Sequence, residues 1–144
     1  MTRPDRAVQL FKEGFSCSQA ILAVYGAERG ISPELLAKLG TGFAGGMARQ
    51  GLTCGAVTGG VMALGLVHGQ ATAADGEAKE KTFAFVQEFM EQFQERHGAL
   101  ACRDLLGYDL STPEGRAAAK GSGRVDAFCP TLVRSAAEIM EELL

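Results

Sequence analysis

Three observations predict an all-α fold: the size and composition of the chain, the helical spacing of its apolar residues, and a series of helix-start signals. The chain has 144 residues, of which 47% are hydrophobic and 22% are charged, as in ordinary globular proteins. A chain of this length typically forms one domain. We therefore expect residues 1–144 to fold as a single-domain bundle of about six to eight helices around a central glycine-rich helix, where the count follows from the apolar periodicity.

The first three expected helices each carry a start signal. Pro4 suits the first turn of a helix that continues to about residue 13. The segment Ser16-Cys17-Ser18-Gln19 is a capping box, in which a hydroxyl and an amide side chain satisfy free backbone groups. Ser32 and Pro33 provide an N-cap and a first helical residue for a third helix, which ends at Gly40.

The middle of the chain is rich in glycine. Residues 40–47 predict a loop or a broken helix beside Cys54, and Thr53 is the expected N-cap of a helix that continues to about His68. Gly55 and Gly59 within this helix each cost roughly 1 kcal/mol relative to alanine. Such a cost is tolerated where another backbone or a cofactor approaches closely, which makes both glycines candidate cofactor-binding positions.

The second half of the chain predicts four further helices. Residues 77–97 have the clearest amphipathic pattern, and a short helix over residues 99–106 follows. Residues 112–121 form the next expected helix, and residues 121–128 are expected to be loop. The last helix is expected to begin at Pro130 and to continue to the end of the chain.

Composition and charge exclude several classes of protein. The formal net charge of −3 leaves no surplus of cations to neutralise phosphates, so we expect no nucleic acid partner. The N-terminal segment lacks the apolar core of a signal peptide, and the apolar stretch of residues 52–67 is too short for a membrane span. We therefore expect a cytoplasmic protein with no membrane partner. The redox partner is unknown from sequence, and a homodimer is a candidate assembly.

The four cysteines are the strongest functional signal. They stand at Cys17, Cys54, Cys102 and Cys129, without the C-x-x-C spacing of zinc ribbons or thioredoxins. Three of them fall at expected helix starts, with Cys129 as an N-cap before Pro130. The free amides and dipole of a helix N-terminus stabilise a thiolate. We therefore expect lowered pKa values for Cys17 and Cys54, and we expect the four thiols to converge on one site.

Five segments carry a resemblance to a known family. The chain resembles the redox-active family labelled C_GCAxxG_C_C in the segments Phe15–Ala20, Gly42–Met47, Thr53–Gly60, Cys102–Asp109 and Cys129–Pro130. The resemblance implies a small bacterial or archaeal protein with redox-active cysteines and no established substrate. A similar module in split-Soret-type multihaem cytochromes looks like an iron–sulfur unit, and this likeness implies that an iron–sulfur cluster is a candidate cofactor here.

The sequence leaves several functions open. Cys17, Cys54, Cys102 and Cys129 are the candidate catalytic residues and also the candidate metal ligands. In a thiol mechanism, Cys17 or Cys54 attacks a disulfide and a neighbouring thiol resolves it. In a cluster mechanism, all four thiolates bind iron. The alternatives are a zinc-binding module without turnover and a helical interaction protein whose thiols only pack in the core.

Overall fold

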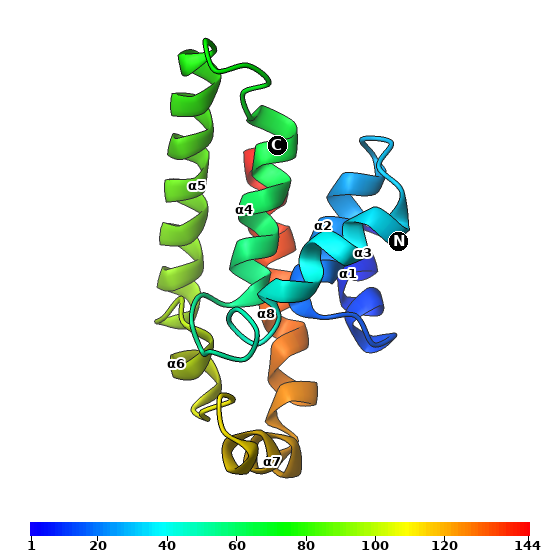
Figure 1. The fold of residues 1–144 in the computed structure, drawn as a ribbon, viewed down its shortest axis with the longest axis vertical. Helices are drawn as coiled ribbons and strands as arrows, with labels where there is room; N and C mark the ends of the chain where they lie inside the picture. The colour runs from blue at the N-terminus through cyan, green and yellow to red at the C-terminus, as the bar shows by residue number, and fades with distance from the viewer.

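The structure, a computed structural model, describes residues 1–144 and is entirely helical, as predicted (Figure 1). It contains eight α-helices, one short 3-10 helix and no strand. In chain order the elements are α1 (Arg3–Lys12), α2 (Cys17–Ala27), α3 (Pro33–Gly40), η1 (Thr41–Phe43), α4 (Gly55–His68), α5 (Gly76–His97), α6 (Cys102–Leu106), α7 (Pro113–Ser122) and α8 (Arg124–Leu143). None of these helices combines the length and the apolar character needed to cross a membrane.

The glycine-rich helix α4 is central, as the sequence predicts. It packs against α2, α5 and α8, and Figure 1 shows it between the long helix α5 and the group formed by α1, α2 and α3, with α8 behind it. Residues 55–60 of α4 are all buried. Small residues let helices approach closely, because no side chain separates the two backbones.

The predicted start signals at Ser16 and Ser32 are confirmed, and three further helices also begin at a capping side chain. The side chain of each N-cap accepts a hydrogen bond from a backbone amide in the first turn of its helix. These N-caps are Thr2, Ser16, Ser32, Asp75 and Thr112. Side chains of this type satisfy amides that have no partner within the helix. The local sequence therefore determines where these five helices begin.

The prediction for the start of α8 was wrong. The helix begins at Arg124, so residues expected to be loop form its first turns and Pro130 lies inside it. Proline within a helix removes one hydrogen bond and costs about 3 kcal/mol. The side chain of Arg124 offsets part of this cost. It donates to the carbonyl oxygens of Leu105 and Leu106 at the end of α6, at 2.8 and 2.9 Å, and it stacks on Phe128.

Two apolar clusters fill the interior. The larger one joins α1, α2, α4, α5 and α8 and includes the fully buried side chains of Tyr25, Phe89 and Phe93. The smaller cluster contains Cys102, Leu106 and Cys129, at the end of the molecule formed by α6, α7 and the start of α8. The cysteines lie where these two clusters meet.

Candidate functional site

Cys17 is positioned by the capping box at the start of α2. The amide of Ser16 donates to Gln19 Oε1 at 3.0 Å, and the amide of Gln19 donates to Ser16 Oγ at 3.4 Å. Cys17 is therefore the first residue of α2, as predicted. This arrangement fixes the backbone that carries the thiol, which is the only partly exposed one of the four.

Cys54 and Cys102 are held by a short backbone pairing. The amide of Cys54 donates to the carbonyl of Leu100 at 2.8 Å, and the amide of Cys102 donates to the carbonyl of Leu52 at 2.6 Å. The intervening residue pair forms an isolated antiparallel bridge. The pairing shifts both helix starts from their predicted places, since α6 begins at Cys102 and Cys54 itself, not the residue before it, is the N-cap of α4.

Cys129 lies within α8 and not at its start. The expectation that it is an N-cap is corrected by the earlier beginning of this helix at Arg124. Its side chain is buried in the smaller cluster with Cys102. Cys129 lies more than one turn after the first residue of α8, beyond the free amides of the helix N-terminus, so these amides do not stabilise this thiol.

One cavity brings the four cysteines together. Its volume is about 270 Å³, and the side chains of Cys17, Cys54, Cys102 and Cys129 all line it. Most of the remaining wall is apolar, and it includes Phe11, Leu105, Leu106, Leu110, Val125 and Leu132. Thiols from four elements that are far apart in the sequence therefore face a common, largely apolar space.

Cys17 and Cys129 form the most intimate pair in this cavity. Cys17 packs against the cluster that contains Cys129, and each of the two thiols shifts the pKa of the other. A hydrogen bond from Cys17 to the ionised form of Cys129 lowers the pKa of the Cys129 thiol, and the nearby positive charge of Arg124 acts in the same direction, against the effects of burial and of Asp126. The same hydrogen bond, together with burial, raises the pKa of Cys17. Cys129 is thus the thiol most readily ionised, with Cys17 as its donor.

The expectation of lowered pKa values at Cys17 and Cys54 was wrong. Burial raises the pKa of Cys54 to about 12, although the amides of Ala56 and Val57 at the start of α4 oppose this rise. Burial also raises the pKa of Cys102 to about 11. Desolvation penalises the charged form of a buried thiol, and at these positions it outweighs the helix amides.

Gly55 and Gly59 lie where α4 meets α2. A Cβ atom on Gly59 would lie 3.0 Å from both the carbonyl oxygen of Ser18 and Cβ of Ile21, and one on Gly55 would lie 3.1 Å from the Ser18 amide. Gly55 also lines the cavity, whereas Gly59 does not. The structure thus places a helix backbone against both glycines, and their role toward a cofactor stays a prediction.

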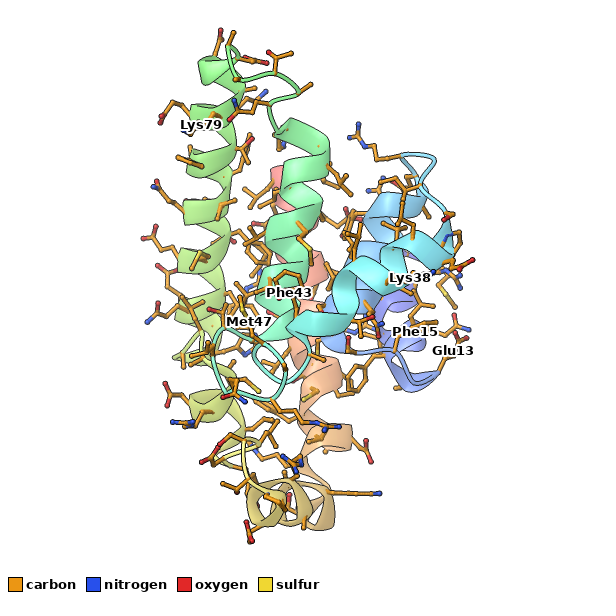
Figure 2. All side chains as sticks on the ribbon, viewed as in Figure 1. Glu13, Phe15, Lys38, Phe43, Met47 and Lys79 are labelled. Atoms are coloured by element: carbon orange, nitrogen blue, oxygen red, sulfur yellow. The ribbon has the colours of Figure 1, made fainter.

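Sequence reasoning missed Arg49, the only charged side chain that lines the cavity. It stands at the end of a turn in which five consecutive residues have positive φ: Gly45, Gly46, Met47, Ala48 and Arg49. This loop crosses in front of the lower end of α4, where Figure 2 labels Phe43 and Met47. In the sequence, only Gly45 and Gly46 indicated this turn. They predicted a loop, but they did not predict that the following residues also have positive φ.

The side chains as they are placed do not form a metal site. No group of three or more Cys, His, Asp or Glu side chains is close enough to hold one ion. Tetrahedral zinc requires all four sulfurs about 2.3 Å from one centre, and the zinc alternative stays a prediction. An iron–sulfur cluster distributes its thiolates over several irons, and a cavity with four thiols in its wall is compatible with that donor set.

Comparison with known proteins gives one match. The family model described as "Putative redox-active protein (C_GCAxxG_C_C)" matches residues 15–143. No curated protein and no solved structure matches the chain.

Proposed function

Because this chain belongs to the C_GCAxxG_C_C family, we propose that it transfers electrons by thiol–disulfide exchange at Cys17 and Cys129. The observation that supports the proposal is that both thiols line one cavity together with the other two cysteines, where Cys17 packs against the cluster that contains Cys129. A disulfide requires two sulfur atoms about 2.05 Å apart, and both thiols face the same small cavity. The pair is therefore well placed to form a reversible disulfide.

In the proposed reaction Cys129 is the attacking thiol. Its thiolate attacks one sulfur of a substrate disulfide, forms a mixed disulfide and releases the other substrate sulfur as a thiolate. Cys17, after giving up its proton, then attacks the sulfur of Cys129. This step forms the Cys17–Cys129 disulfide and releases the second substrate thiolate. Two electrons pass from the protein dithiol to the substrate, and the two protein thiol protons end on the two product thiols.

Cys54 and Cys102 have a different role in this proposal. Burial raises the pKa values of both thiols, so they remain protonated at neutral pH. The thiolate is the reactive form of cysteine, and the first attack therefore falls to Cys129. We assign Cys54 and Cys102 to the wall of the cavity, where they complete the four-cysteine pattern.

An iron–sulfur cluster is the second candidate, favoured by the presence of all four cysteines in the wall of one cavity. Cys17, Cys54, Cys102 and Cys129 would hold it, and a bound cluster would supply one-electron transfer. The apolar wall would limit access of water, which is one of the factors that set the reduction potential of a cluster.

The experiment that separates these candidates begins with protein purified without oxygen. We expect a colourless protein in which a small neutral disulfide, bis(2-hydroxyethyl) disulfide, removes two of the four free thiols, and peptide mapping should find the Cys17–Cys129 bond. Cys129→Ser should abolish this bond, whereas Cys54→Ser should still form it. Absorption near 400 nm, the rough range for cysteine-ligated iron, together with bound iron would establish the cluster instead. Four thiols that persist after oxidation would refute the exchange mechanism.

A further inference from the structure

Arg49 gives the cavity a single site of positive charge. Every other residue that lines it is uncharged in its ordinary protonated form, and most are apolar. The guanidinium makes no ion pair within the chain, since the six salt bridges all involve other cations. An arginine that borders an apolar cavity without a partner is available to bind an anionic group of a ligand, because its planar guanidinium matches a carboxylate.

The backbone holds Arg49 at the cavity despite an unfavourable conformation. Met47, Ala48 and Arg49 have φ values of 63°, 48° and 68°. Left-handed backbone costs residues with a Cβ atom about 1–2 kcal/mol each. Hydrogen bonds from Gly51 to the Gly45 carbonyl and from Leu52 to the Gly46 carbonyl close the turn, at 3.2 and 3.0 Å. Strain of this kind persists where the surroundings fix it, and it is concentrated at ligand-binding segments.

A second cavity of about 300 Å³ lies next to the cysteine cavity and is also lined by positively charged side chains. It shares Arg49, Leu110 and Val125 with the cysteine cavity and adds Arg116 and Lys120, with Asp126 as its only acidic residue. The chain as a whole carries a net charge of −3, so this local excess of cations differs from the rest of the molecule. The charges favour an anion at the shared boundary of the two cavities.

We infer that the substrate is a small disulfide with an apolar body and a terminal carboxylate, an inference that rests on the proposed thiol–disulfide exchange. The apolar body fits against Phe11 and Leu132, and the carboxylate binds Arg49. The cysteine cavity is at the small end of ligand pockets, which are roughly 300–1,000 Å³, and this size excludes a bulky substrate. The exchange is the two-step reaction given above, in which the substrate disulfide is reduced to two thiols and Cys17–Cys129 is oxidised.

The carboxylate preference is tested first without redox chemistry. Octanoate and octanamide share an apolar chain and differ in charge, and isothermal titration calorimetry compares their binding to the reduced protein. We expect octanoate to bind about tenfold more tightly, as one charge-assisted hydrogen bond provides. Arg49→Gln should remove this preference for octanoate, and Arg49→Lys should keep part of it. The control variant Arg29→Gln, at an exposed position outside both cavities, should keep the whole preference. Equal binding of the two compounds to the wild-type protein would overturn the inference.

The substrate is then tested with lipoate and lipoamide, which carry the same cyclic disulfide on a chain ending in a carboxylate or a neutral amide. We expect the reduced protein to form the Cys17–Cys129 bond about tenfold faster with lipoate, a difference lost in Arg49→Gln. Equal rates with both compounds would overturn the substrate class and leave the exchange mechanism intact. Reaction with neither compound, alongside selective octanoate binding, would overturn the exchange mechanism and with it the assignment of a disulfide substrate. Circular dichroism melting verifies that each variant is folded.

Discussion

The acidity of a thiol in this site depends on which partner donates to its thiolate. The interaction with the Cys17 thiol lowers the pKa of Cys129, and the charge of Arg124 acts in the same direction, against the effects of burial and of Asp126. Cys54 has helix amides nearby, yet its pKa rises because the side chain is buried. Charge-assisted hydrogen bonds are stronger than neutral ones, so a donor to the thiolate opposes the rise in pKa that burial causes.

This dependence predicts the effect of removing the donor. Cys17→Ala should raise the pKa of Cys129, because its thiolate loses the hydrogen bond. The rate at which iodoacetamide alkylates Cys129 at pH 7 should fall about tenfold, the effect of losing roughly 1.5 kcal/mol of a charged hydrogen bond. Mass spectrometry of the Cys129 peptide measures this rate. Cys17→Ser retains a hydroxyl donor and should keep much of the reactivity, so equal rates in all three proteins would show that Cys17 does not tune Cys129.

Residue types and local patterns predicted part of the site. The capping box located Cys17 correctly, and the four cysteines were identified as the candidate site before their positions were known. The thiol acidities could not be predicted at Cys17 and Cys54, because the sequence does not give the burial that raises both pKa values. Arg49 could not be found, since the positive φ values of Met47, Ala48 and Arg49 have no local signal beyond the neighbouring glycines.

At the scale of elements, the crossing of α2 and α4 positions Cys17 relative to Cys54. The two helices meet where Ser18 approaches Gly55 and Gly59. Cys17 and Cys54 lie next to this crossing, at the starts of their helices. A larger separation of α2 and α4 would therefore change the cavity that both thiols line.

Two glycines of α4, one at this crossing and one outside it, predict opposite effects on stability when each is replaced by alanine. Gly59→Ala places a methyl group 3.0 Å from the Ser18 carbonyl oxygen and Ile21 Cβ, which should destabilise the protein by about 1–3 kcal/mol through overpacking. Gly65→Ala meets nothing within 4 Å and should stabilise it by up to roughly 1 kcal/mol. Urea denaturation of the reduced proteins measures both changes. Comparable stability of the two variants would mean that α2 moves away at little cost.

Helix boundaries were predicted well where a side chain caps the helix, and poorly where contacts with distant segments determine the first residue of the helix. Ser16 and Ser32 cap their helices as expected. The start of α8 depends on contacts from Arg124 to the end of α6, and the start of α6 depends on pairing with residues before α4. Such contacts join segments that are far apart in the chain, and no local propensity signals them.

At the scale of the whole molecule, the site joins two parts of the bundle. The larger apolar cluster includes Cys54, and the smaller one includes Cys102 and Cys129. Cys17, at the start of α2, packs against both clusters. A bond formed or broken between the thiols therefore connects α2 to α8 across the boundary of the two clusters.

Oxidation of the proposed pair should stabilise the whole protein. Cys17 and Cys129 are more than one hundred residues apart in the chain, and a disulfide between them would close a long loop in the unfolded state. Disulfides typically contribute about 2–4 kcal/mol, which for a protein of this size is an increase in Tm of roughly 5–15 °C. Differential scanning calorimetry compares the oxidised protein with the same sample after reduction. In Cys129→Ser this bond is absent, so oxidation and reduction should leave its Tm unchanged. The contrary outcome is an unchanged Tm in the wild-type protein although peptide mapping finds the Cys17–Cys129 bond. Strain in the disulfide would then cancel the stabilisation that comes from closing the loop in the unfolded state. In that case the thiols are not held in a geometry suited to reversible exchange.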